Sequence, residues 1–209
     1  MHSKTLKVNP EIDTLVKTQQ MMQQAQLQLD QERLKDKKTK SKDVDVNSNN
    51  EAMQAGQYDQ PENPLPPIHL DKPGLECEMT LKPHYKAVGY IGSNKLSKMV
   101  AIVTGGDSGI GRAISVLFAR EGAKIAIIYL NEHEDAEQAA ADVAAEGQEC
   151  LLISGDIRKS SFCKEAVNRV LNEWGQIDIV INNTDFQLIA DSLMEFRDEA
   201  IVRNFTTNF

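Results

Sequence analysis

The sequence predicts an α/β fold over residues 98–209, in which helices cover both faces of a doubly wound parallel sheet. Two observations support this fold class. Short runs of Val, Ile, Leu and Ala alternate along the chain with segments of helical spacing. Each apolar run is also hydrophobic at successive positions, as expected for a strand that is buried on both faces. Strands that alternate with helices form parallel sheets through right-handed crossover connections.

The first strand and the first helix are predicted on either side of a glycine-rich segment. Residues 99–103 form an apolar, β-branched run of strand length. Residues 112–121 space their apolar side chains along one helical face, and Gly122 is suited to end that helix.

The same rhythm continues to the end of the chain. The second, third and fourth strands are predicted at residues 124–130, 150–154 and 177–181. The remaining helices are expected at residues 135–146, 161–174 and 194–209. In sheets of this type the fourth strand is internal and pairs with a fifth, which the sequence does not contain. We therefore expect a sheet truncated after the fourth strand, with an unpaired apolar edge through which copies of the chain could associate.

The first 97 residues divide into two parts of different composition. Residues 1–43 form a Gln-rich, charged tail. A short amphipathic helix is one alternative for this tail. Its apolar stripe is shorter than a coiled coil needs, so we favour a mostly solvated tail. Residues 44–97 form an extended, mostly irregular arm, since six of the seven prolines fall within 61–83. The arm could lie along its own domain or along a neighbouring subunit, and so provide a second surface for a homo-oligomer.

Composition argues against several function classes. The net charge of -8 disfavours nucleic acid and anionic membrane surfaces as partners. No apolar stretch resembles a signal peptide core or reaches transmembrane length, so we expect a cytoplasmic protein. The three cysteines form no C-x-x-C pair and are expected as buried thiols in a reducing compartment. The four histidines have no metal-binding spacing, and no metal site is expected.

The loop between the first strand and the first helix has the pattern of a dinucleotide-binding site. Residues 104–111 read Thr-Gly-Gly-Asp-Ser-Gly-Ile-Gly. Gly105 permits the tight turn, Gly109 lets the backbone approach a pyrophosphate, and Gly111 lets the helix pack closely on the sheet. The helix N-terminus offers free N–H groups and a positive dipole end to phosphates. An ordinary strand–turn–helix connection is the alternative, but the flanking strand and helix favour a Rossmann fold.

The segment 104–112 resembles the cofactor loop of short-chain dehydrogenases/reductases. Asp156 and Ile157 resemble the family pair whose carboxylate contacts the adenine ring, and Asn182-Asn183 resembles the N-N-A-G segment of the family. The arm, with Pro-Gly-Leu-Glu at 73–76, resembles the bacterial glucose/ribitol dehydrogenase-like subgroup. The resemblance implies a nicotinamide dinucleotide, NAD(P), bound by Thr104, Gly105, Asp107, Ser108, Gly109, Ile110, Gly111, Tyr129, Asn131, Asp156, Ile157, Asn182 and Asn183.

Two departures from the family pattern concern the cofactor. Tyr129 stands where an acidic residue would hold the ribose 2'-hydroxyl of NAD, so NADP becomes permissible. With Arg112 as the nearby positive charge, we expect NADP slightly more than NAD; Tyr129 and Asn131 could bind either a hydroxyl or a phosphate. Thr184-Asp185 stands where the family has small residues, and a carboxylate there could weaken cofactor affinity.

A third departure concerns catalysis. Family members carry a serine and a Tyr-x-x-x-Lys pair, whose lysine lowers the tyrosine pKa. Neither is found in this sequence, and Asn208 alone stands at a position of the catalytic tetrad. The resemblance implies an NAD(P)-dependent oxidoreductase for a small alcohol or carbonyl substrate, with this chain providing the cofactor-binding half, so that we do not expect turnover by the chain itself. The alternatives are a non-catalytic dinucleotide-binding or interaction protein, and an inactive remnant.

Overall fold

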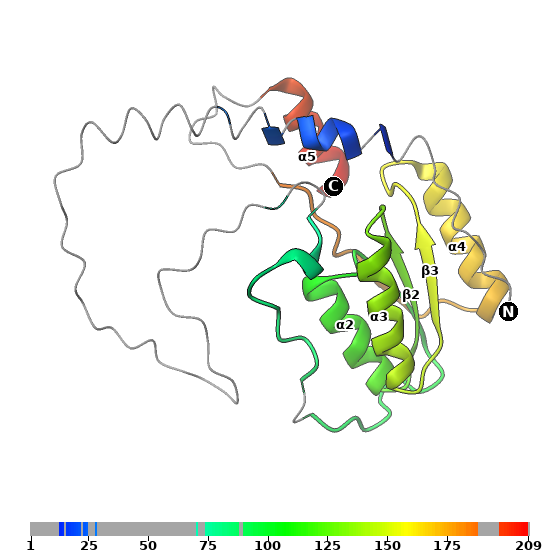
Figure 1. Ribbon diagram of the computed structural model, residues 1–209. Helices are drawn as coiled ribbons and strands as arrows, with labels where there is room; N and C mark the ends of the chain where they lie inside the picture. The colour runs from blue at the N-terminus through cyan, green and yellow to red at the C-terminus, as the bar shows by residue number, and fades with distance from the viewer. Residues whose placement is uncertain are drawn as a thin grey trace, which may run out of the picture.

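A computed structural model describes residues 13–14, 16–21, 23–24, 28, 70, 74–87, 90–187 and 197–208. Its centre is a parallel sheet of four strands in the order β3-β2-β1-β4 (Figure 1). The strands are β1 (Val100–Thr104), β2 (Lys124–Tyr129), β3 (Cys150–Ser154) and β4 (Ile179–Ile181). The helices are α2 (Gly109–Arg120), α3 (His133–Ala145), α4 (Ser160–Trp174) and α5 (Asp198–Asn208). The predicted fold class is confirmed.

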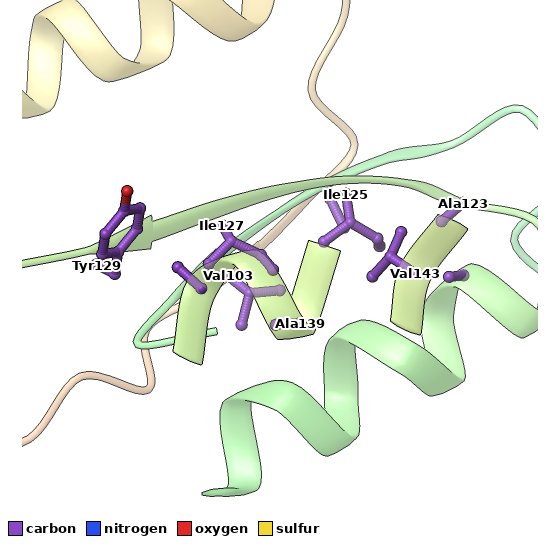
Figure 2. Close-up of a cluster of buried hydrophobic side chains, with 10 residues drawn as sticks. Val103, Ala123, Ile125, Ile127, Tyr129, Ala139 and Val143 are labelled. Atoms are coloured by element: carbon purple, nitrogen blue, oxygen red, sulfur yellow. The ribbon is translucent and has the colours of Figure 1, made fainter. Parts of the chain in front are cut away.

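Helices cover both faces of the sheet because alternate strand residues point to opposite sides. On one face, Val103, Ile125 and Ile127 pack under α2 and α3 (Figure 2). Alanines at 136 and 139 bring α3 close to the strands. On the other face, buried side chains of β1, β2 and β3 pack against two side chains of α4. The strand residues are Val100, Ile102, Ala126, Ile128 and Ile153, and the helix residues are Ala166 and Val170. The apolar runs are continuous because both faces of the strands are buried.

The strands place their carboxyl ends at one edge of the sheet. β1 and β2 pair from Val100 with Lys124 to Thr104 with Ile128. The pairing of β1 with β2 extends to this edge, since the N–H of Gly105, just after β1, donates to the carbonyl of Ile128 in β2 at 2.7 Å. The loops that follow β1, β2 and β3 therefore lie beside one another, where parallel α/β sheets hold their ligands.

The fourth strand lies at an open edge. It pairs with β1 alone among the strands that the structure describes. Val180 is 54% exposed, whereas every residue of β1 is buried. The strand is shorter than the predicted run 177–181, although Asp178 still bonds to the start of β1: its N–H donates to the carbonyl of Val100 at 2.9 Å, and its carboxylate accepts from the N–H of Val100 at 2.8 Å. The predicted unpaired edge is thus confirmed.

The arm lies along its own domain. Its described part, residues 74–87 and 90–97, crosses α2 and α3. The Tyr85 hydroxyl donates to the Asp142 carboxylate of α3 at 2.9 Å. The Arg120 guanidinium of α2 donates to the carbonyls of Lys86 and Ala87, both at 2.8 Å. One 3-10 turn, η1 (Glu76–Glu78), interrupts the otherwise irregular chain. Around Pro83 the chain is irregular, as expected, whereas the other five prolines of 61–83 lie outside the residues that the structure describes.

Part of the Gln-rich tail is helical. The described residues among 13–28 all have helical conformation, and both Val16 and Gln19 are buried. The described residues of the tail thus form the short helix that the sequence left open, and most of them are exposed; the mostly solvated tail stays a prediction. The rest of residues 1–43, and residues 44–69, lie outside the described part of the chain.

The remaining compositional expectations have mixed outcomes. The three cysteines are free, but Cys77 is exposed on η1 rather than buried. Burial raises the pKa of the Cys150 thiol to about 12. Among the helices that the structure describes, none has the length and apolarity to cross a membrane. The described residues also contain no cluster of side chains that could hold a metal ion.

Candidate functional site

A cavity of about 340 Å³ opens at the carboxyl edge of the sheet. Its walls come from the loop after β1, the ends of β2 and β3, the segment after β4, and α5. Nine of the predicted cofactor residues line it: Gly105, Asp107, Ser108, Gly109, Ile110, Tyr129, Asp156, Ile157 and Asn183. The lining does not include Thr104, Gly111, Asn131, Asn182 or Asn208. The strand topology thus brings most of the predicted site residues into one cavity.

The glycine loop has the shape that the sequence pattern requires. Gly105 has a φ of +61°, and a Cβ there would lie 3.1 Å from the Asn183 side-chain nitrogen. A Cβ on Gly111 would lie 1.9 Å from the carbonyl oxygen of Gly105, so the helix could not approach the loop as closely. Gly109 has a φ of +50° and open space around its Cα. Glycine is therefore required at these positions by backbone conformation or by close approach.

The N-terminus of α2 presents hydrogen-bond donors to the cavity. The first helical N–H, of Gly109, donates to a Glu76 carboxylate oxygen at 2.6 Å. The N–H groups of Ile110 and Gly111 have no acceptor among the described residues, and Ile110 is 74% exposed. Two adjacent free donors at the positive end of a helix dipole form an anion-binding position.

Thr104 and Asn183 hold the glycine loop to the segment after β4. The Thr104 hydroxyl oxygen accepts from the N–H of Asn183 at 2.9 Å and of Thr184 at 3.1 Å. The Asn183 amide donates to the carbonyls of Thr104 at 3.2 Å and Gly105 at 3.1 Å. These two residues therefore shape the cavity, whereas the neighbouring Asn182 is exposed.

Asp156, predicted to contact adenine, already has a partner. The Arg158 guanidinium donates to both carboxylate oxygens, from Nε to Oδ1 at 3.0 Å and from a terminal nitrogen to Oδ2 at 2.8 Å. Burial raises the pKa of Asp156, but the hydrogen bonds from Arg158 outweigh it, so that the pKa lies below the usual value. Asp156 and Arg158 both line the cavity as a neutralised pair.

Two lining residues that the sequence analysis missed come from outside the sheet. Arg203 of α5 is 5% exposed, and its guanidinium lies 4.5 Å from the centre of the Phe186 ring. Burial lowers the pKa of Arg203 to about 10. Gln19 of the tail helix lines the same cavity. No local signal marked either residue, because their place depends on how distant segments pack.

The end of β2 carries a carboxylate that the sequence analysis also missed. Glu132 lines the cavity, and its Oε2 accepts from the N–H of Leu130 at 3.2 Å and of Asn131 at 2.9 Å. Tyr129 is buried, with its hydroxyl 3.0 Å from His133 Nδ1, and burial raises its pKa. Tyr129 stands where the sequence analysis looked for an acidic group, and the carboxylate nearest to it in the cavity wall along the chain is that of Glu132, three residues later.

Arg112 does not face the cavity. It is 3% exposed, its Nε donates to the carbonyl of Asp107 at 2.7 Å, and one terminal nitrogen pairs with Glu76 at 2.7 Å. The guanidinium also lies 5.1 Å from the Tyr85 ring centre. The nearby positive charge on which the expectation of NADP rested is therefore directed into the protein, toward the arm.

The loop residue Asp107 is a buried carboxylic acid beside the anion-binding position. Burial, with a contribution from the nearby charge of Glu132, raises the pKa of Asp107 to about 6. Thr184 and Asp185 line the cavity as well. The side chain of Asp185 is exposed, so its charge is partly screened by solvent.

Asn208 joins α5 to the segment after β4. Its side-chain oxygen accepts from the N–H of Phe186 at 2.9 Å, and its amide donates to the carbonyl of the same residue at 3.1 Å. Both polar atoms of the side chain are bonded to backbone. In this structure the residue positions a loop of the cavity wall.

The fold and the loop geometry agree with a direct comparison of sequences. The sequence profile of the family described as short chain dehydrogenase matches residues 99–209. The chain belongs to this family. General stress protein 39 of Bacillus subtilis (strain 168) is 49% identical over 138 residues, which cover 66% of this chain and 48% of that protein. Glucose and ribitol dehydrogenase of Daucus carota is 35% identical over 143 residues, covering 66% of this chain and 49% of that protein.

Two solved structures have a similar fold over part of their length. A short chain dehydrogenase from Burkholderia cenocepacia J2315 in complex with NADP is 33% identical and superposes with a TM-score of 0.52 over 55% of this chain and 46% of that one. An NAD+-bound xylitol dehydrogenase is 29% identical, with a TM-score of 0.52 over 55% of this chain and 44% of that one. The chain spans about half the length of the curated relatives that it matches.

Proposed function

We propose that this chain binds a nicotinamide dinucleotide and provides the cofactor-binding half of an oxidoreductase site. The observation that carries the proposal is the pair of free N–H groups at Ile110 and Gly111, which stand at the start of α2 beside the cavity. A pyrophosphate is the anion that this position accommodates in Rossmann folds. Membership of the short-chain dehydrogenase family supports the same assignment.

The lining residues fit the rest of the dinucleotide. Asp156 and Ile157 would border the adenine ring, and the segment that begins at Asn183 would border the nicotinamide half. When bound, the nicotinamide supplies or accepts the hydride exchanged with an alcohol or carbonyl substrate. The chain's own groups bind, orient and screen the cofactor. Asn208 positions the segment after β4 through its two bonds to Phe186.

Proton transfer to a substrate needs a group that these 209 residues do not contain. None of the four tyrosines is followed by a lysine four residues later. In Tyr-x-x-x-Lys the lysine lowers the tyrosine pKa so that the tyrosine can act as acid or base near neutral pH, and these tyrosines lack that partner. We therefore assign cofactor binding to this chain, and hydride transfer to the family site of which it is a part. The free thiols support a reducing, cytoplasmic location.

The ribose end of the cavity supports NAD over NADP. The cation that favoured NADP, Arg112, is paired with Glu76 and buried. The Glu132 carboxylate occupies the two N–H groups at the end of β2 that a 2'-phosphate would otherwise use. A carboxylate beside a phosphate is repelled, whereas a ribose hydroxyl can donate a hydrogen bond to it.

Dinucleotide titration of the purified chain tests the proposal. We expect saturable binding of NADH, followed by fluorescence or calorimetry, and weaker binding of NADPH. Gly111→Ala should abolish binding, because its Cβ would meet the Gly105 carbonyl at 1.9 Å. Gly147→Asn is the matched control: its φ of +84° suits asparagine, and a Cβ there meets open space. Binding without turnover agrees with the non-catalytic alternative, whereas a folded chain that binds neither dinucleotide contradicts the proposal and leaves an inactive remnant.

A further inference from the structure

Glu76 of the arm reaches the dinucleotide loop. The residue lies on η1, is 6% exposed, and divides its carboxylate between two donors. One oxygen accepts from the N–H of Gly109 at 2.6 Å, and the other accepts from the Arg112 guanidinium at 2.7 Å. The arm is therefore bonded to the first turn of α2, where the free donors of the cavity stand.

The same guanidinium extends the connection to the loop and to α3. Arg112 donates from Nε to the carbonyl of Asp107 at 2.7 Å and from a terminal nitrogen to the carbonyl of Asp135 at 3.0 Å. Asp135 in turn accepts the backbone N–H of Glu76 at 2.7 Å. We call this group, Glu76, Asp107, Gly109, Arg112 and Asp135, the arm–loop junction.

The arm–loop junction holds two backbone groups of the loop that flank the anion-binding position. The carbonyl of Asp107 and the N–H of Gly109 are both fixed by arm-linked side chains. Gly109 has a left-handed φ of +50°. An unrestrained glycine also populates other backbone conformations, which compete with this one. Gly74 of the arm also lines the cavity itself.

We propose that Glu76 is a positioning residue for dinucleotide binding, and that attachment of the arm and binding of the cofactor are thermodynamically coupled. The carboxylate takes the first N–H of α2, so the next two N–H groups are held toward the cavity. The Arg112 guanidinium, 2.7 Å from one of its oxygens, offsets part of the repulsion between this carboxylate and a phosphate. Coupling of this kind is reciprocal, so the dinucleotide must stabilise the docked arm as much as the arm favours the dinucleotide. The inference rests on the proposed function.

Calorimetric titration with NADH on the full chain gives the first test. Glu76→Gln keeps the shape of the side chain but replaces one acceptor by an amide donor, which cannot accept from both Gly109 and Arg112. We expect NADH binding to weaken roughly tenfold, the change that loss of one charge-assisted hydrogen bond produces. Lys86→Ala is the matched control, because it removes an arm contact to Asp142 of α3 without touching the loop. Its NADH affinity should stay within about twofold of wild type.

Hydrogen exchange on the wild-type chain gives a second test that does not depend on a variant folding. Saturating NADH should slow exchange in residues 105–112 and also in residues 74–80. Protection of the loop without protection of residues 74–80, or a folded Glu76→Gln variant that binds NADH as wild type does, overturns the inference while the proposed function stands. If wild type shows neither binding nor loop protection, the proposed function itself fails and the inference fails with it.

Discussion

Replacing Arg112 by methionine should destabilise the domain far more than replacing Arg120, a partly buried arginine of the same helix. Arg112 is 3% exposed and lies 2.7 Å from a Glu76 oxygen and 3.5 Å from an Asp135 oxygen. Methionine fills most of the volume but leaves two buried carboxylates without a counter-charge. Removing one partner of a buried ion pair costs about 3–5 kcal/mol, and we expect a loss of that size.

Chemical denaturation monitored by circular dichroism measures this loss, and Arg120→Met provides the control. Arg120 also donates to arm carbonyls and pairs with Glu146 at 2.6 Å, but it is only partly buried. Partly exposed pairs of this kind contribute up to about 1 kcal/mol. The double variant Glu76→Met/Arg112→Met should recover part of the loss, because fewer charges stay unpaired. A loss below about 1 kcal/mol for Arg112→Met would refute the assignment of the arm–loop junction as a buried ionic network.

Three further predictions concern pH, cofactor preference and the sheet edge. The pKa of Asp107 is raised to about 6, so the folded protein favours the protonated carboxyl of this residue. The folding free energy gained from that protonation is present below the unfolded pKa of 3.8 and is lost as the pH rises through 6. NADH binding should also weaken between about pH 5.5 and 7.5, because an ionised Asp107 carboxylate in the cavity wall repels the pyrophosphate. Asp107→Asn, titrated over the same range, should bind NADH independently of pH there; an unchanged pH dependence in the variant would point to another group. Glu132→Gln should raise the NADPH affinity relative to NADH by about tenfold in paired calorimetric titrations, since one repulsive charge is removed; an unaltered ratio contradicts the role given to Glu132. Val180→Lys on the open edge of β4 should shift sedimentation toward the monomer without lowering the unfolding midpoint, because Val180 is 54% exposed; persistent association would place the interface elsewhere.

The fold could be predicted because its signals are local. The apolar runs and the glycines stand within a few residues of the strands and turns that they form, and the loop 104–111 carries its own conformational requirements. Helix α2 begins at Gly109 rather than at residue 112, because the glycines of the loop make up its first turn. The sequence analysis located this helix from the spacing of its apolar side chains, and the glycines of the first turn do not contribute to that spacing.

The direction of Arg112 could not be predicted from the sequence. Its nearest carboxylate partner stands 36 residues earlier, in a proline-rich arm that could equally have crossed to another subunit. The residues next to Arg112 in the sequence do not determine the direction of its side chain, so a guanidinium that faces the ribose was equally compatible with them. Glu132 was missed for a related reason: the turn after Tyr129 folds the carboxylate back onto the N–H groups of Leu130 and Asn131, and this geometry is not visible in spacing.

The strand order of the sheet also constrains the order in which the chain can fold. β1 is made before either of its neighbours, β2 and β4, and its pairing with β4 joins residues as distant as Ala101 and Ile179. Such non-local parallel pairings close long loops and form slowly. During synthesis β1 can first pair only with β2, and one of its edges stays open until the segment 179–181 has emerged. Over that interval the arm, which precedes β1 in the chain, is already available to dock on α2 and α3, so the half of the domain that holds the glycine loop can assemble first.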